Sequence, residues 1–242
     1  MSATLARVSL LIIATTLQSL SAVPPNPTPD GAHQARFHKP ALASLDRDTG
    51  GVGGESNPKG WTRPKSDQMG SRIGSFYLPY VFSAFIWILV MLEVPRSHGH
   101  EDPLNRRLVL GTLLTALASL LRLSSFRSLG RHFTYQLAIL PSHSLVTTGP
   151  YAYIRHPSYV ALPFTIFGWT LSSTSQGTAL REWFGGSIAD RVVLIAMVGM
   201  LYVCWQLAKR ADVEDQVLKK EFGKEWEEWA RVVKYRFIPG LY

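Results

Sequence analysis

Cysteine is almost absent from this chain. Only one of its 242 residues, Cys204, is a cysteine, so the chain can form no intrachain disulfide and no zinc site built from several cysteines. Cys204 lies within an apolar run, where its expected role is that of a small buried hydrophobic residue. The cysteine content therefore excludes a disulfide scaffold and a cysteine zinc cluster.

Charged residues are also scarce. They make up 17% of the chain, against about a quarter in soluble domains, whereas hydrophobic residues make up 46% and are clustered in runs. This composition is typical of an integral protein of a lipid bilayer. The formal net charge is nevertheless +8, which in a membrane protein favours basic cytosolic loops beside anionic lipid headgroups.

Motifs for other classes of ligand are missing. The chain has no Gly-x-Gly-x-x-Gly element and no basic recognition helix, so we expect no nucleic acid as a partner. The glycine run at residues 50–54 lacks the lysine and the serine or threonine that end a phosphate-binding loop. Residues 98–102 read His-Gly-His-Glu-Asp without a further ligand pair, so we expect a solvated loop there and no metal site.

The first third of the chain divides into two regions. Residues 5–20 are apolar and are followed by small residues that resemble a cleavage site, so residues 1–22 are either a signal peptide or an uncleaved membrane anchor. Residues 23–72 are rich in proline and glycine and have no sustained apolar period, which predicts a disordered linker. Residues 73–242 are then the membrane domain.

Four further apolar stretches predict membrane-spanning helices, at residues 76–92, 108–121, 159–173 and 192–208. Arg122, Arg127, Arg131 and Arg155 lie between the second and third of these, and the tail after residue 208 is rich in lysine and arginine. The positive-inside rule places both regions on the cytosolic face, which favours an uncleaved first helix. We therefore expect an all-α polytopic membrane protein with about five transmembrane helices.

The tail shows a helical period of its own. Hydrophobic residues recur there at spacings of four, four, three and four positions: Leu218, Phe222, Trp226, Trp229 and Val233. Residues at these spacings lie on one face of a helix. The pattern predicts a cytosolic C-terminal amphipathic helix that lies on the membrane or against the spans.

A polar, aromatic and turn-rich stretch at residues 143–159 lies next to predicted spans. Irregular backbone beside a bilayer is tolerated where protein or a water-filled cavity satisfies it, so the stretch is typical of a site. Arg210 and Glu214 lie one helical turn apart, just after the last predicted span. Both groups belong to the predicted cytosolic surface, and we expect them to converge.

These two groups resemble the motifs of a known family. Residues 142–160 read Ser-His-Ser-Leu-Val-Thr-Thr-Gly-Pro-Tyr-Ala-Tyr-Ile-Arg-His-Pro-Ser-Tyr-Val, which resembles the signature of the isoprenylcysteine carboxyl methyltransferases. Arg210, Glu214 and Asp215, followed by Phe-Gly-Lys-Glu-Trp at residues 222–226, resemble the second motif of that family. The Arg-His-Pro-x-Tyr element and the acidic pair also occur in membrane methyltransferases that act on phospholipids and in relatives of sterol reductases.

The resemblance implies S-adenosylmethionine as methyl donor and a C-terminal prenylcysteine as acceptor. Its substrates would be prenylated C-terminal CaaX-type proteins after proteolysis, and its location the endoplasmic reticulum membrane with the site facing the cytosol. Arg210 would be the catalytic residue and would bind the substrate carboxylate. The implied cofactor-binding residues are Gln136, His143, Ser144, Leu145, Val146, Tyr151, His156, Pro157, Ser158, Tyr159 and Glu214.

Some residues depart from the family or allow a simpler interpretation. Ala161 stands where the family usually has glycine, and Asp215 replaces the second glutamate of the usual acidic pair. His156 alone would be interpreted as a turn residue, and Tyr153 and Arg155 as anchors at the membrane interface. The pair of Arg210 and Glu214, taken alone, would be an ordinary ion pair on a helix surface.

The chemistry of the acceptor fits arginine. A carboxylate is already ionised at neutral pH, so methyl transfer to it needs no general base but does need positioning and desolvation. Arginine offers a planar, bidentate fork that remains charged. Two alternatives stay open: a phospholipid N-methyltransferase, whose acceptor amine must lose a proton, and a non-catalytic membrane scaffold whose basic tail binds anionic lipids.

Overall fold

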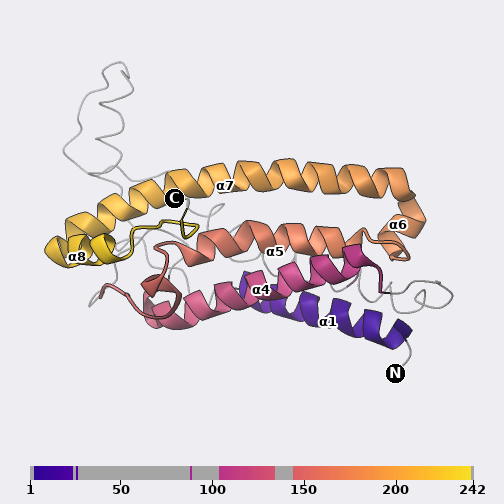
Figure 1. The fold of residues 1–242 in the computed structure, drawn as a ribbon, viewed down its shortest axis with the longest axis horizontal. Helices are drawn as coiled ribbons and strands as arrows, with labels where there is room; N and C mark the ends of the chain where they lie inside the picture. Colours follow the sequence, from indigo (N-terminus) through magenta and orange to yellow (C-terminus); the bar gives the residue numbers. More distant parts are fainter. Residues whose placement is uncertain (1–2, 24–25, 27–87, 89–103, 134–143, 241–242) are drawn as a thin grey trace, which may run out of the picture.

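A computed structural model describes residues 3–23, 26, 88, 104–133 and 144–240 (Figure 1). Within these ranges all regular structure is helical, as the sequence predicted. The long helices are α1 (Ala3–Ala22), α4 (Arg106–Leu129), α5 (Pro157–Ser173) and α7 (Gly186–Phe222). The short ones are η2 (Gly130–His132), η3 (Gly149–Ala152), α6 (Ala179–Phe184) and α8 (Lys224–Val232).

Helix α4 lies between α1 and α5, and α7 runs along the other side of α5 (Figure 1). Glycine permits the close approach of α4 to α5. A Cβ atom on Gly111 would lie 2.5 Å from the Ser172 backbone nitrogen, and one on Gly168 would lie 2.7 Å from the Thr115 backbone nitrogen. Any side chain at either position would push the two helices apart.

Two of the described helices are long and apolar enough to cross a membrane: Arg106–His132, which is α4 with η2, and Gly186–Phe222, which is α7. The apolar window of α7 is barely buried by the rest of the protein, and Leu194, Ile195 and Leu201 are exposed along it. Helices also form at the apolar run of residues 5–20, as part of α1, and at the predicted span of residues 159–173, as part of α5. The predicted span at residues 76–92 lies outside the described residues except for residue 88, and the number of about five spans stays a prediction.

Helix α4 is longer than the predicted span at residues 108–121. The sequence predicts that Arg122 lies in the loop after this span, which is wrong, because the helix continues to Leu129 with Arg122 buried inside the bundle. Arg122 Nε donates to the Ser21 carbonyl oxygen at 2.8 Å. Its NH1 donates to the Ser158 carbonyl oxygen at 3.1 Å and to the Ser158 hydroxyl at 2.9 Å. Oxygen atoms from two other helices therefore accept hydrogen bonds from the buried guanidinium.

Replacing Arg122 by alanine is expected to lower the free energy of unfolding by about 3 kcal/mol, because buried acceptors lose a charged donor. Thermal and denaturant unfolding in detergent micelles would measure the loss. Arg127→Ala, at an exposed position of the same helix, is the matched control and is expected to cost no more than about 0.5 kcal/mol. Equal losses in both variants would contradict a structural role of Arg122.

The tail differs from the single helix that the sequence predicted. Helix α7 runs on to Phe222, the chain turns at Gly223 with a φ of +53°, and α8 follows as a separate helix. Glycine adopts such a positive φ without the steric cost that a Cβ atom would impose. Leu218 and Phe222 therefore belong to α7, whereas Trp226 and Trp229 belong to α8. The turn brings Trp229 back against Tyr151.

Candidate active site

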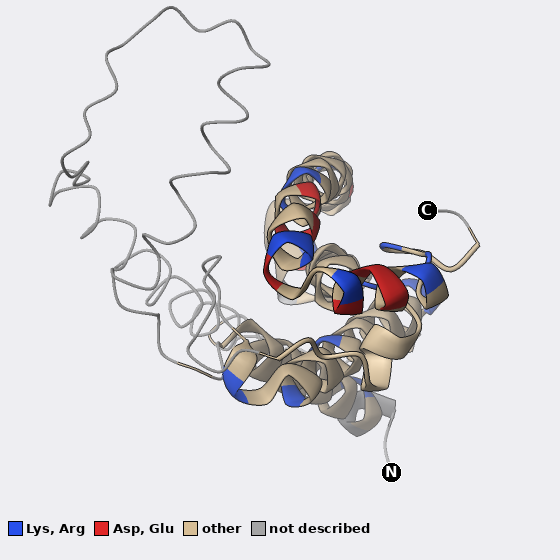
Figure 2. Cartoon of the chain, turned by 90° about the vertical axis from the view of Figure 1, so that its left-hand side faces the viewer, with Lys and Arg blue, Asp and Glu red and all other residues tan. Residues whose placement is uncertain are grey.

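The candidate site lies at the end of the bundle where α5 begins and the polar half of α7 passes over it. Figure 2 looks at this end and shows acidic and basic residues gathered on α7 and α8. The chain enters α5 through an irregular segment, since Gly149 has a φ of +62° and Pro150 lies in the first turn of η3. A Cβ atom on Gly149 would lie 2.3 Å from the Ser128 hydroxyl, which would have to rotate away, so the positive φ is the stronger reason for glycine here.

An apolar cluster supports this segment. Tyr151, Trp229 and Val233 are buried together, and Leu145 and Val146 pack against them. Trp229 Nε1 donates to the Tyr151 carbonyl oxygen at 3.1 Å, which joins α8 to η3. Burial raises the pKa of the Tyr151 phenol above its usual range, and the negative charge of Glu214 raises it further. The Tyr151 side chain is therefore neutral and forms part of this apolar cluster.

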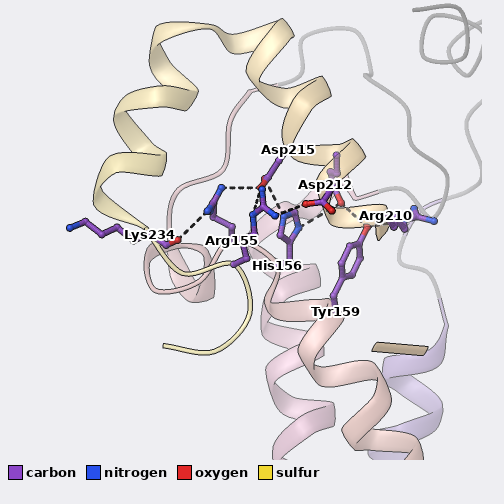
Figure 3. A network of polar contacts seen from close by, with 9 residues as sticks. Arg155, His156, Tyr159, Arg210, Asp212, Asp215 and Lys234 are labelled. Carbon is purple, nitrogen blue, oxygen red and sulfur yellow. Dashed lines mark hydrogen bonds and ion pairs between the residues drawn. The ribbon is translucent and has the colours of Figure 1, made fainter. Parts of the chain in front are cut away.

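Tyr159 lies between the two residues that the sequence singled out on the tail. Its hydroxyl donates to Glu214 Oε2 at 2.6 Å, and Arg210 Nε donates to the same hydroxyl at 2.8 Å (Figure 3). The Arg210 guanidinium carbon also lies 5.9 Å from the Tyr159 ring centre. The predicted convergence of residues 143–159 with the Arg210–Glu214 turn is therefore confirmed. A tyrosine hydroxyl links these two residues.

His156 lies beside both acids of the tail. Its Nε2 is 3.1 Å from Asp215 Oδ1, and its Nδ1 is 3.7 Å from Glu214 Oε2. The ring stacks on that of Tyr159, with centres 5.3 Å apart and planes at 13°. The side chain is only 5% exposed. His156 thus braces Tyr159 and Glu214 from the protein side.

Asp215 contacts several residues of the polar network, although it is not among the site residues predicted from the sequence. Its side chain is 4% exposed, and its Oδ2 lies 2.9 Å from Arg155 NH1 and 3.2 Å from Arg236 Nε, in addition to the contact of Oδ1 with His156 (Figure 3). Consecutive residues of a helix point about 100° apart, so Glu214 and Asp215 leave α7 in different directions. This helix geometry is the signal that could have separated them.

Arg155 was interpreted from the sequence as an interface anchor, and the structure places it in the polar network. Its NH1 donates to Asp215, its NH2 donates to the Lys234 carbonyl oxygen at 3.0 Å, and its guanidinium carbon lies 5.8 Å from the Trp226 ring centre. Tyr153, by contrast, is 74% exposed. The role of Arg155 depends on its contact with Asp215, which lies 60 positions later in the sequence. No local pattern around Arg155 indicates this contact.

The remaining residues of the predicted site have separate positions. Pro157 begins α5 and is buried, and Ser158 is buried against Arg122. Ser144 is exposed, with its hydroxyl 3.3 Å from His132 Nε2. Ala161, which departs from the family glycine, is fully buried. Gln136 and His143 lie outside the described residues.

The structure thus collects most of the described site residues into two neighbouring groups. One is polar and contains His156, Tyr159, Arg210 and Glu214, and the other is apolar and contains Leu145, Val146 and Tyr151. Trp226 packs against the apolar group, and its ring centre lies 5.8 Å from the guanidinium carbon of Arg155, which bonds Asp215. No group of three or more possible metal ligands occurs within the described part of the chain, and residues 98–102 fall outside it.

The described helices form a bundle with a polar site at one end, and two of them are long and apolar enough to cross a membrane. These features suggest an integral membrane protein. Residues 109–220 match the model of the isoprenylcysteine carboxyl methyltransferase (ICMT) family. The matched residues include the whole polar group around Tyr159 and end before α8 and the C-terminal segment. The match agrees with the resemblance seen in the sequence and covers 112 of the 242 residues.

Several proteins of known name are similar to this chain. Protein-S-isoprenylcysteine O-methyltransferase B of Arabidopsis thaliana is 30% identical over 129 residues, which is 51% of this chain and 55% of that protein. The Protein-S-isoprenylcysteine O-methyltransferase of Dictyostelium discoideum is 28% identical over 138 residues, or 54% and 49% of the two chains. A Delta(14)-sterol reductase of Neurospora crassa is 27% identical over 191 residues, or 66% and 39%. The chain thus spans about half, or less, of the length of these relatives.

Proposed function

We propose that this protein transfers a methyl group from S-adenosylmethionine to the C-terminal carboxylate of a prenylated cysteine. The observation that carries the proposal is the contact of Tyr159 with both Arg210 and Glu214, within the part of the chain that matches the family. It joins a cation suited to a carboxylate acceptor and an anion suited to a cationic donor. Both are needed for this reaction.

The described residues fit the donor. Of the two adjacent acids, Asp215 is 4% exposed and surrounded by cationic groups, whereas Glu214 is 31% exposed and lies next to Tyr159. Glu214 can therefore accept hydrogen bonds from an ammonium group or a ribose hydroxyl. The aromatic faces of Tyr151 and Tyr159 attract a cation. The bound donor would supply an electrophilic methyl group on a sulfonium.

The apolar group beside Glu214 would complete the donor site. Leu145 and Val146 are partly buried against Tyr151 and Trp229, and they offer an apolar surface to an adenine ring. We propose that Ser144, Gln136 and His143 contribute polar contacts to the donor, as the family resemblance implies. The site would be supported from the interior of the protein by three buried residues, His156, Pro157 and Ser158.

Arg210 would bind the acceptor. An ionised carboxylate needs no base, but it reacts slowly when hydrated, so a residue that orients and desolvates it is the main requirement. The Arg210 guanidinium is held in place by its hydrogen bond to the Tyr159 hydroxyl. A planar fork of donors in a fixed orientation matches the geometry of a carboxylate.

The position of Arg210 along α7 would suit a substrate with a lipid chain. Exposed apolar residues line α7 as far as Trp205, and the Lys209 ammonium nitrogen lies 3.6 Å from the centre of the Trp205 ring. Tryptophan and lysine mark membrane interfaces. Arg210 follows directly, so its guanidinium would meet the polar end of a molecule whose prenyl chain lies in the bilayer.

The remaining features of the proposal follow from the family and the charge pattern. We propose a membrane domain at residues 73–242 preceded by an uncleaved first helix at 1–22 and a linker at 23–72. About five transmembrane helices would place the site and the amphipathic helix at the cytosolic face. The substrates would be CaaX-type proteins after prenylation and proteolysis, and the endoplasmic reticulum would be the location.

The test is an acceptor comparison with the full-length protein in membranes. Labelled S-adenosylmethionine is supplied with either acetyl-farnesylcysteine or phosphatidylethanolamine, and we expect label in the farnesylcysteine ester. Label in the lipid alone would support the phospholipid N-methyltransferase instead. Calorimetric titration with S-adenosylhomocysteine tests the scaffold alternative, because a scaffold would bind none.

A further inference from the structure

The C-terminal segment, residues 233–237, lies against the entry to α5. The backbone N–H of Arg155 donates to the Tyr235 carbonyl oxygen at 3.0 Å, and that of His156 donates to the Arg236 carbonyl oxygen at 2.9 Å. Both residues precede α5, so their N–H groups have no acceptor within that helix. The C-terminal segment supplies these acceptors, and it therefore supports the backbone on which His156 is carried.

Arg236 fastens the same segment to α7. Its NH1 contacts Asp212 Oδ1, and its Nε lies 3.2 Å from Asp215 Oδ2. Asp212 and Asp215 lie three positions apart and so share one face of α7. The next residue, Phe237, has its ring centre 5.8 Å from that of His156. One arginine thus connects the C-terminal segment to α7 at the position of the buried acid.

A short series of contacts leads from Arg236 to the proposed reaction site. Asp215 holds the ring of His156, the ring of His156 stacks on Tyr159, and the hydroxyl of Tyr159 bonds both Arg210 and Glu214. Figure 3 labels Asp215, His156, Tyr159 and Arg210 along this series. The orientation of Tyr159 therefore depends on how Asp215 and His156 are held.

We propose that Arg236 is a positioning residue for methyl transfer, which acts on the donor site through Asp215 and His156. The inference rests on the proposed function and adds a residue that lies beyond the region matched by the family model, which ends at residue 220. Arg236 itself would touch neither donor nor acceptor. Its effect is to keep His156 and Tyr159 in the orientation that presents Glu214 to the donor.

The effect of Arg236 can be separated from folding. Asp215 is also paired with Arg155 at 2.9 Å, so loss of Arg236 leaves the buried carboxylate neutralised. The Arg236 side chain is 26% exposed, so a shorter polar residue is solvated there. The variant Arg236→Gln is therefore expected to fold, with the C-terminal segment released from α7.

The experiment compares Arg236→Gln with Arg231→Gln in the full-length protein. Arg231 is exposed on α8 and gives the same change of charge. In Arg236→Gln we expect the amides of Arg155 and His156 to exchange hydrogen about tenfold faster, because the charge-assisted contact with the buried Asp215 is lost. The Kd of S-adenosylhomocysteine and the KM of the donor are expected to rise about tenfold for the same reason. The KM of acetyl-farnesylcysteine is expected to rise by no more than about threefold, because Arg210 keeps its charge and its position on α7 and only its contact with Tyr159 is weakened.

A conservative variant sharpens the comparison. Arg236→Lys keeps the charge but presents a single ammonium, which contacts Asp212 or Asp215 rather than both, so intermediate values are expected. If Arg236→Gln matches Arg231→Gln in exchange, Kd and KM, the inference is overturned. It is also overturned if activity falls only in proportion to the folded fraction, with unchanged KM values.

The outcomes also separate this inference from the proposed function. If the wild-type protein binds no S-adenosylhomocysteine, the proposed function fails. Faster exchange at Arg155 and His156 in Arg236→Gln, with Arg231→Gln unchanged, then still supports the hold of Arg236 on His156. Wild-type binding together with unchanged exchange in Arg236→Gln would overturn the inference and leave the function standing.

Discussion

Replacing Arg210 by alanine is expected to lower kcat/KM for acetyl-farnesylcysteine by about a thousandfold, the cost of removing a positioned charged group from a reaction site. The physical reason is that the acceptor carboxylate loses the guanidinium that orients and desolvates it. Tyr159 loses its hydrogen bond from Arg210 but keeps the one to Glu214, so the Kd of S-adenosylhomocysteine is expected to stay within about threefold. Steady-state kinetics and calorimetry on the same preparation measure both.

Two further variants define what Arg210 contributes. Arg210→Lys keeps a charge but loses the bidentate fork and the Nε donor to Tyr159, and we expect it to recover only part of the activity. Lys209→Ala, at the adjacent exposed position, is the control and is expected to leave turnover nearly unchanged. An equal loss of S-adenosylhomocysteine affinity in Arg210→Ala would show that Arg210 belongs to the donor site instead.

Replacing Asp215 by asparagine is expected to be the most damaging change to stability. The amide has the same size as the carboxylate, but it leaves Arg155 without its buried anion and weakens the hold on Arg236 and His156. Removing one partner of a buried ion pair costs about 3 to 5 kcal/mol. Denaturant unfolding in detergent micelles would measure the loss, and S-adenosylhomocysteine binding is expected to weaken with it.

The comparison for Asp215 has a control and a conservative variant. Glu221→Gln removes an exposed acid from the same helix and is expected to change stability by no more than about 0.5 kcal/mol. Asp215→Glu introduces the residue usual in the family. It adds a methylene where the carboxylate already meets Arg155 and His156, so a cost of about 1 kcal/mol or more is expected. Unchanged stability in Asp215→Asn would contradict the central role of this residue.

The predicted and observed helices agree best where a long apolar run is flanked by polar residues. The runs at residues 159–173 and 192–208 became parts of α5 and α7, because apolar residues that recur without a break favour a helix in a membrane protein. The end of α4 was missed for a physical reason. An arginine at the end of an apolar run is expected at an interface, and only its partners Ser21 and Ser158 show that Arg122 is buried.

The tail shows how a correct pattern gave an incomplete structure. The spacing of Trp226, Trp229 and Val233 correctly indicated a buried helical face, since Trp229 and Val233 are in the apolar cluster with Tyr151. Gly223 interrupts the helix without disturbing the spacing of the apolar residues on either side. A periodic pattern counts positions along the chain, so it cannot show that the axis changes direction at a glycine.

The sequence by itself determined the helical class, the resemblance to the isoprenylcysteine carboxyl methyltransferases and the convergence of the stretch at residues 143–159 with Arg210 and Glu214. These follow from local periodicity and from residues that keep a fixed order and spacing. Only the tertiary structure decided which acid is buried and which is accessible, and it alone brought Arg155, Asp215 and Arg236 together. Their partners are separated by long stretches of chain, and the pairing of one carboxylate with several cations depends on packing that no local pattern records.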